Sequence, residues 1–281
     1  MACSDIRIRI LVDNNVSTGL AEEHGFSALI EVSGNSILFD TGQGKALVPN
    51  AAILACDLRR VDTLILSHGH YDHVGAVSQV LQIAPTTRVF CHAGSLLTRY
   101  SIRSGEAPRT ISMPISEMKA ILDLPAYQVQ WLTAPRQIFP DVGVTGPIPR
   151  THPWEDTGGP FFLDAEGRYP DPMVDDMALW VNTSRGLIIL LGCCHSGLVN
   201  TVEHIRSASG VERVFGIIGG LHLVNASRER LTATCSALRT WDTDFVVPCH
   251  CTGDEAMAFL NNELGSKVTQ GYAGLELQPM V

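Results

Sequence analysis

A dense run of potential metal ligands, His68-Gly69-His70-Tyr71-Asp72-His73, constrains the fold of this chain more than any other feature. It follows Val61–Leu66, a short apolar stretch that predicts a buried strand. Neutral imidazole nitrogens suit zinc, iron, nickel or copper, and a carboxylate adds a harder ligand. The run therefore predicts a loop at a strand end that binds a divalent cation.

The spacing within this run favours two neighbouring metal positions. In an extended loop His68 and His70 point to the same side, so they can converge on one ion. Asp72 and His73 come where the chain turns into a helix, and they can face a second ion. A solvated polar loop is the competing interpretation, and so many ligand-type side chains in succession weigh against it.

Short apolar stretches alternate with stretches of helical spacing, which predicts an α/β protein. The predicted strands are Ile6–Val12, Ala28–Val32, Ser36–Phe39, Val61–Leu66, Arg88–Cys91, Met177–Asn182, Gly186–Leu191, Val211–Ile218 and Phe245–Val247. The predicted helices are Ala46–Ala55, Gly75–Ile83, Leu198–Ile205, Arg228–Leu238 and Asp254–Leu264. The 281 residues suit a single domain over 1–281, in which the Pro/Gly-rich stretch of about 98–172 is expected to form an insert or lid.

The charge balance bears on the kind of partner. A formal net charge of -9 would repel nucleic acid and anionic membranes, so we expect neither and favour a small-molecule substrate. The start of the chain, Met1 to Asp5, does not resemble a leader, no apolar run approaches the ~20 residues of a membrane span, and the eight cysteines lack a regular spacing. These features predict a cytoplasmic protein with reduced thiols. Whether the protein forms a homo-oligomer is left open by these features.

Several motifs of this chain resemble those of a known family. Ser67–Gly75 resembles the HxHxDH motif of the metallo-β-lactamase superfamily, and Leu38-Phe39-Asp40-Thr41-Gly42 resembles the strand-ending Asp-Thr-Gly that precedes it. The resemblance implies a four-layer αββα sandwich with a metal site at one edge of the two sheets. Further motifs are similar to a branch described as like dihydropterin–ribofuranosylaminobenzene phosphate synthase: Glu23–Ser27, Gly146–Arg150, Asp175–Leu179, Gly192–Gly197, Gly219–Leu223 and His250–Gly253.

The resemblance also implies a ligand set. His68 and His70 would bind the first ion and Asp72 and His73 the second, with His195 and His250 each completing one site. Many superfamily members carry a bridging aspartate where this chain has Cys193. That departure leaves open whether one or two divalent ions are bound, and whether Cys193 supplies a thiolate or packs as a small apolar residue. Zinc is the expected metal, with iron or manganese as alternatives.

Several other residues are candidates for the pocket. Asp40 is expected to orient the histidine loop through hydrogen bonds. His24 either lines the pocket or caps the sheet edge. His222 is expected in the pocket as a catalytic residue, with a structural role as the alternative. Arg150 and Arg168 can meet an anionic substrate group or form surface ion pairs. At alternating positions, Cys249 and Cys251 are expected to point away from His250 and pack.

Three functions fit this ligand set. The first is a hydrolase that uses metal-activated water on an ester, phosphoester or related bond, with Asp72 accepting a proton. The second, implied by the branch resemblance, is a transferase that condenses a pterin pyrophosphate with an aromatic amine. The third is a metal-bearing sensor or effector without turnover.

Overall fold

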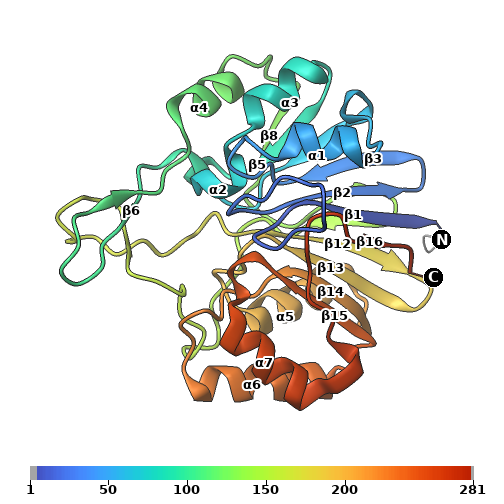
Figure 1. The fold of residues 1–281 in the computed structure, drawn as a ribbon, viewed down its shortest axis with the longest axis vertical. Helices are drawn as coiled ribbons and strands as arrows, with labels where there is room; N and C mark the ends of the chain where they lie inside the picture. The colour runs from blue at the N-terminus through green and yellow to red at the C-terminus, as the bar shows by residue number, and fades with distance from the viewer. Residues whose placement is uncertain (1–4, 280–281) are drawn as a thin grey trace.

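Two β-sheets pack face to face in the computed structural model, which describes residues 5–279 (Figure 1). The first sheet has the strand order β16-β1-β2-β3-β4-β5-β8. Its strands are β1 (Ile6–Val12), β2 (Ser27–Val32), β3 (Asn35–Phe39), β4 (Thr63–Ile65), β5 (Arg88–Cys91), β8 (Val129–Trp131) and β16 (Glu276–Leu277). Residues 1–4, to which the expectation about a leader refers, and residues 280–281 lie outside the described residues.

The second sheet repeats the plan of the first, with the order β15-β14-β13-β12-β10-β9. Its strands are β9 (Arg136–Phe139), β10 (Val142–Val144), β12 (Ala178–Thr183), β13 (Gly186–Leu191), β14 (Val214–Gly220) and β15 (Phe245–Cys249). Along the chain, the first strands of each sheet pair antiparallel and the later ones pair parallel. The parallel strands are β3, β4, β5 and β8 in the first sheet and β13, β14 and β15 in the second. Because the carboxyl ends of parallel strands share one edge, the loops after β4, β13, β14 and β15 can meet there.

Helices cover the outer face of each sheet (Figure 1). The helices above the first sheet are α1 (Leu47–Ile53), α3 (Val77–Ile83) and α4 (Ile115–Leu122), and those below the second are α5 (Leu198–Ser209), α6 (Arg228–Thr240) and α7 (Asp254–Leu264). The short helix α2 spans Tyr71–Val74. The 3₁₀ helices are η1 (Leu58–Arg60), η2 (Ala93–Leu96), η3 (His250–Thr252) and η4 (Gly265–Lys267). The predicted helix Gly75–Ile83 is thus preceded by a separate turn of helix, α2.

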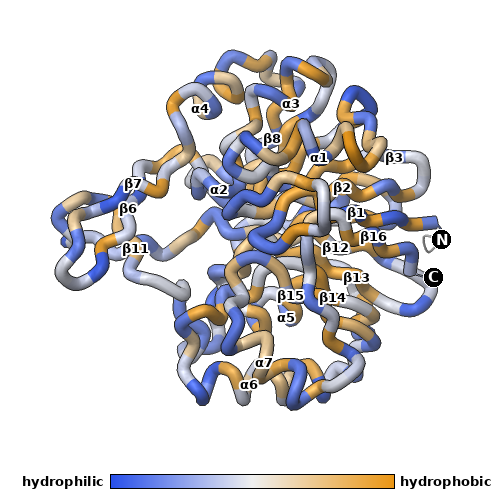
Figure 2. The backbone as a smooth tube through the Cα atoms, viewed as in Figure 1, coloured by the Kyte–Doolittle hydropathy of each residue, from blue (hydrophilic) through white to orange (hydrophobic). Residues whose placement is uncertain are grey.

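Three apolar clusters hold these layers together. One lies between the sheets and includes Ile30 and Leu190, and the other two lie between each sheet and its helices. Figure 2 shows the hydrophobic segments concentrated in the strands of the interior. Gly186–Leu191 is buried at every position because both faces of β13 are covered, which explains its unbroken apolar run. The predicted four-layer αββα fold is confirmed.

The middle stretch is divided rather than forming one insert over 98–172. Helix α4 and strands β8, β9 and β10 belong to the sandwich. The segments β6 (Tyr100–Ser101), β7 (Arg109–Thr110) and β11 (Phe161–Phe162) form a small separate sheet that projects at the left of Figure 1. The strands of the sandwich in this stretch have only three or four residues each, which is too short for their periodicity to be visible in the sequence. Within residues 5–279, no helix is both long and apolar enough to span a membrane.

Candidate metal centre

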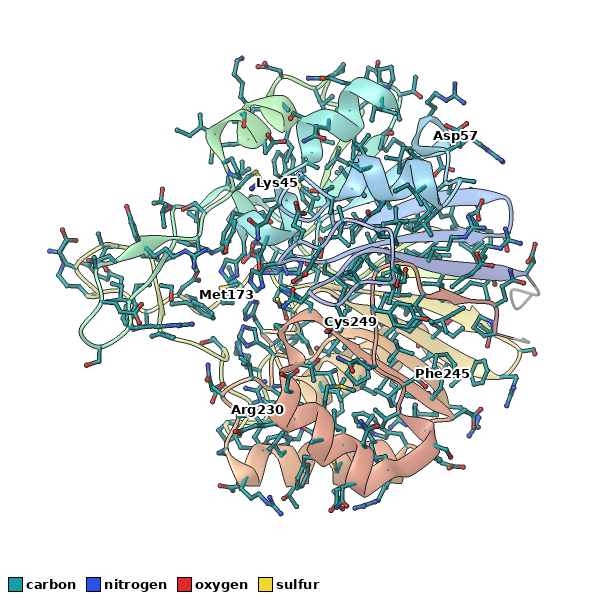
Figure 3. The ribbon with its side chains drawn as sticks, viewed as in Figure 1. Lys45, Asp57, Met173, Arg230, Phe245 and Cys249 are labelled. Carbon is teal, nitrogen blue, oxygen red and sulfur yellow. The ribbon has the colours of Figure 1, made fainter. Side chains whose placement is uncertain are left out.

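Histidines from four loops meet at the shared edge of the two sheets. His68, His70 and His73 follow β4, His195 follows β13, His222 follows β14 and His250 begins η3 after β15. Figure 3 marks Cys249, the last residue of β15, among the strands in the interior. Neighbouring rings lie close, with centroids 4.6 Å apart for His68 and His70, 4.8 Å for His68 and His195, and 5.0 Å for His73 and His250.

The first group of ligand-type atoms comes from His68, His70 and His195. Their ligand nitrogens lie within 4.8 Å of one another. All three rings are buried, and the Nε2 atom of each has no hydrogen-bond partner among the described residues. Burial lowers the pKa of each of these imidazoles well below its ordinary value, so the rings are neutral. Buried polar atoms are normally paired, so three unpaired nitrogens facing one another fit a divalent cation.

Hydrogen bonds on the other side of two of these rings determine the tautomer. His195 Nδ1 lies 2.8 Å from the carbonyl oxygen of Thr157, which can only accept, so Nδ1 carries the proton. The Ser67 hydroxyl donates to Asp40 and therefore accepts from His68 Nδ1 at 2.9 Å. In both rings Nε2 keeps its lone pair for a cation.

The second group consists of His24, Asp72 and His250, whose ligand atoms also lie within 4.8 Å of one another. The Asp72 carboxylate is 3.1 Å from His24 Nε2 and 3.4 Å from His250 Nε2. Burial alone would raise the pKa of Asp72, but hydrogen bonds from these two rings hold that pKa well below its ordinary value. Burial lowers the pKa of His250 to about 4. A carboxylate between imidazoles is a ligand set suited to a second cation.

His73 lies between these two groups. Its Nδ1 is 2.7 Å from Asp40, and its Nε2 is 3.3 Å from His250 Nε2 and 3.1 Å from the sulfur of Cys193. Burial opposes a charge on His73, but the neighbouring Asp40 carboxylate outweighs it and raises the pKa of His73 to about 9. The structure thus groups His73 with His68 and Cys193, whereas Asp72 is grouped with His24 and His250.

Three aspartates hold the ligand loops in place. Asp40 accepts hydrogen bonds from the Ser67 amide and hydroxyl at 2.7 and 2.6 Å, in agreement with the orienting role expected from the sequence. Asp175 accepts from the Gly69 amide at 2.8 Å, and Asp176 accepts from the Ser196 amide at 2.7 Å. From the sequence Asp175-Asp176 is visible only as part of a motif, because the hydrogen-bond partners of both residues are distant in the chain.

A cavity of about 600 Å³ opens above the histidines. His70, Asp72, His222 and His250 contribute to its lining. His222 has a left-handed backbone (φ 43°), an unpaired Nδ1, and a pKa that burial lowers to about 3, so its neutral ring is available inside the pocket. His24 also lines this cavity.

The projecting sheet forms one wall of this cavity. The Phe161 ring on β11 lies 5.2 Å from the ring of His70 and 5.3 Å from that of His195. Arg103 and Arg109 also line the cavity, and Arg109 contacts the Tyr71 ring and hydroxyl. No sequence pattern points to these residues, because they belong to a Pro/Gly-rich stretch without periodicity.

Other candidates lie elsewhere. Arg150 is absent from the cavity lining and instead donates to the His195 carbonyl oxygen at 2.8 Å, so it supports the ligand loop from behind. Arg168 forms exposed ion pairs with Asp164 and Glu166. Cys249 packs between the sheets as expected. The expectation for Cys251 is wrong: its sulfur is grouped with Cys193 and His250, because η3 is a helical turn and not extended chain.

Comparison with known proteins agrees with this geometry. The family model described as "Metallo-beta-lactamase superfamily" matches residues 21–179, which is more than half of the chain. The chain belongs to the metallo-β-lactamase superfamily. Members of this superfamily usually bind divalent metals, and the grouped histidines lie within the same fold.

Three known proteins are similar over nearly the whole chain. The uncharacterised protein MJ0448 of Methanocaldococcus jannaschii is 32% identical, covering 90% of this chain and 93% of that protein. From the same organism, 7,8-dihydropterin-6-methyl-4-(beta-D-ribofuranosyl)-aminobenzene-5'-phosphate synthase is 28% identical, covering 90% and 88%. The crystal structure of Tm1679, described as a metal-dependent hydrolase of the beta-lactamase superfamily, is 29% identical with a TM-score of 0.82, covering 98% of this chain and 100% of that one. The predicted resemblance to the synthase-like branch is confirmed.

Proposed function

We propose that this protein is a metal-dependent hydrolase that cleaves an ester, phosphoester or related bond of a small molecule. The observation that carries the proposal is the set of three buried, unpaired Nε2 atoms of His68, His70 and His195, beside an ionised Asp72 near the cavity. Neutral nitrogens and a carboxylate match what a divalent cation requires.

His68, His70 and His195 would hold one cation, and Asp72 and His250 would hold a second, with His73 and His24 beside them. Zinc fits this set best, with iron or manganese as alternatives. When bound, a divalent cation supplies Lewis acidity and makes water acidic enough to react near neutral pH.

The remaining chemistry comes from the chain itself. If Asp72 does not ligate the second cation, its carboxylate accepts the proton of the attacking water, and the exposed side chain of His24 lies 3.1 Å from it. The neutral ring of His222 donates a hydrogen bond to the substrate or its leaving group. Phe161 excludes water from one side of the ligands. Arg103 and Arg109 in the cavity wall favour a substrate that carries an anionic group.

The His70→Ala variant tests this proposal. We expect it to lose most of its bound metal, measured by mass spectrometry of the digested protein, and to lose hydrolysis of a panel of nitrophenyl esters and phosphoesters. His152→Ala is the matched control, because His152 pairs with Glu203 outside the ligand groups. Both variants are checked for native circular dichroism. A folded His70→Ala variant that keeps its metal and its activity would refute the assignment.

A transferase is the second candidate, since the named synthase of M. jannaschii aligns with 90% of this chain. In that case the protein would condense a pterin pyrophosphate with an aromatic amine and release pyrophosphate. Incubating the metal-loaded protein with a pterin pyrophosphate and an aminobenzoate, beside the ester panel, separates the two activities. Bound metal without turnover in either assay would favour a sensor or effector.

A further inference from the structure

The small sheet that projects at the left of Figure 1 presents one of its faces to the cavity. Its register places Phe161 of β11, Ser101 of β6 and Arg109 of β7 in one row across the three strands. Residues directly opposite one another on antiparallel strands point to the same face of a sheet. All three members of this row line the cavity. The neighbouring row, which points to the other face, is absent from the lining: Phe162, Tyr100 and Thr110.

This face carries two arginines that no carboxylate neutralises. Arg109 belongs to the row, and Arg103 lines the cavity from the same hairpin. Within residues 5–279, no carboxylate oxygen lies within 4.0 Å of either guanidinium, whereas Arg99 and Arg168 each pair with two acidic side chains. Glu106 also lines the cavity from this hairpin, so two positive charges and one negative charge leave a net +1 there. The chain as a whole has a net charge of -9, so a positive patch inside the cavity favours an anionic ligand.

Tyr71 holds the Arg109 side chain in place. The Arg109 guanidinium lies over the Tyr71 ring, 5.3 Å from its centroid, and donates a hydrogen bond to the Tyr71 hydroxyl. A guanidinium has five N–H donors, so this bond leaves the others for a ligand. Arginine binds phosphate or carboxylate through two parallel hydrogen bonds. Because Arg109 is oriented in advance, less side-chain entropy is lost when an anion binds.

The two edges of this sheet lie at different places in the cavity. The Phe161 ring is 5.2 Å from the ring of His70 and 5.3 Å from that of His195, so β11 lies beside the metal-ligand nitrogens. Arg109 is on the opposite edge strand, two strand spacings or about 10 Å from Phe161. An anion at Arg109 is therefore separated by several bonds from a group that reacts at the histidines.

We propose that Arg103, Arg109 and the Ser101 hydroxyl form a subsite for a terminal phosphate or carboxylate group that the protein binds but does not cleave. This proposal rests on the proposed hydrolase function and names its substrate class. The substrates would be small esters or phosphoesters that carry a second, anionic end. Neutral esters and lactones of the same size would bind more weakly.

Two nitrophenyl esters that differ only at their far end test the proposal. The adipate monoester ends in a carboxylate, whereas the hexanoate ester ends in a methyl group. We expect Arg109→Gln to raise the KM for the adipate ester by about 10–100-fold and to leave the KM for the hexanoate ester and both kcat values nearly unchanged. Arg136→Gln is the matched control, because it removes the same charge from an exposed side chain outside the cavity lining. An equal effect of Arg109→Gln on the two esters would overturn the proposal.

A binding measurement keeps the subsite testable if neither ester is cleaved. Phenylphosphonate and phenylacetate, which cannot be hydrolysed, are titrated into the metal-loaded protein in a calorimeter. We expect at least one of them to bind Arg109→Gln about tenfold or more weakly than Arg136→Gln, and that ligand identifies the anion as phosphate-like or carboxylate.

The other outcomes of the titration separate the subsite from the hydrolase function. Equal affinities of the two variants for both ligands, or no binding of either ligand to the wild-type protein, would overturn the subsite. Binding that depends on Arg109, in a protein that cleaves no ester or phosphoester, would support the subsite and contradict the hydrolase function.

Discussion

In the candidate metal centre, four imidazole rings have an oxygen atom as the hydrogen-bond partner of Nδ1, and the kind of oxygen differs from ring to ring. It is a backbone carbonyl for His195, a hydroxyl for His68, a carboxylate for His73 and an amide oxygen, that of Asn14, for His250. Fixing Nδ1 orients each ring and turns its Nε2 atom toward the centre. A carboxylate partner increases the basicity of an imidazole ring more than a neutral oxygen does, so Asp40 has the strongest effect of these four partners.

We predict that Asp40→Asn weakens metal binding by about 10–100-fold, because the amide cannot keep both the Ser67 and the His73 hydrogen bonds. Asparagine tolerates the left-handed backbone at this position (φ 59°), so the variant should fold. Competition with a chromogenic chelator measures the affinity. Asp57→Asn, at an exposed carboxylate beside Arg59, is the control and should bind metal like the wild-type protein. Equal affinities for the two variants would contradict the prediction.

At the scale of elements, the His195 loop depends on the start of α5. Glu155, from the middle stretch, accepts hydrogen bonds from the Val199 and Asn200 amides at 2.8 Å each. Glu155 is buried against Gly197, where a side chain would collide with its carboxylate. The carboxylate therefore caps a helix whose first turn directly follows a ligand loop.

We predict that Glu155→Ala lowers the free energy of unfolding by about 1–3 kcal/mol, because two buried amides lose their acceptor. Urea denaturation of the metal-free protein measures the change. Glu212→Ala, at an exposed position after the same helix, serves as the control. The prediction fails if both variants unfold at the same urea concentration.

At the scale of the whole molecule, the cluster of buried neutral imidazoles links folding to pH. In the folded protein burial lowers the pKa of five histidines below the value of about 6.5 that holds in the unfolded chain. The pKa falls to about 3 for His222 and to about 4 for His250. It falls well below the ordinary value for His68, His70 and His195. Below about pH 6.5 the unfolded chain binds protons that the folded chain does not, so acid favours unfolding.

Four groups oppose this trend: Asp13, Asp176, Glu155, whose pKa burial raises, and His73, whose pKa the Asp40 carboxylate raises to about 9. Burial raises the pKa of Asp13 and of Asp176 to about 6, so the folded protein takes up these protons before the unfolded chain does. Between pH 7 and 5 the five histidines outweigh these four groups, because each histidine gains nearly a full proton in the unfolded chain alone. We predict that the free energy of unfolding of the metal-free protein falls as the pH is lowered from 7 to 5. Each net proton contributes about 1.4 kcal/mol per pH unit.

Denaturant titrations at several pH values in the presence of a chelator measure this slope. His222→Asn removes one of the five histidines, and asparagine suits the left-handed backbone there. We expect this variant to show a shallower slope than the wild-type protein. A free energy of unfolding that stays constant or rises on acidification would contradict the prediction.

Local pattern was enough to predict much of this protein. Apolar stretches located β1, β3, β5 and β13, and α7 begins and ends at the predicted residues. The ligand-rich run after β4 indicated the kind of chemistry. These features depend on residues that are neighbours in the chain, and periodicity and residue type report such relations directly.

The assembly of the site could not be obtained this way, because it depends on how two sheets pack. His73 and His250 are 177 residues apart in the chain, yet their Nε2 atoms lie 3.3 Å apart. The grouping of Asp72 with His24, the wall that Phe161 forms and the turn that brings Cys251 inward follow from the same packing. The residues themselves specify which groups can bind a cation, whereas the parallel order of the strands determines which of them meet.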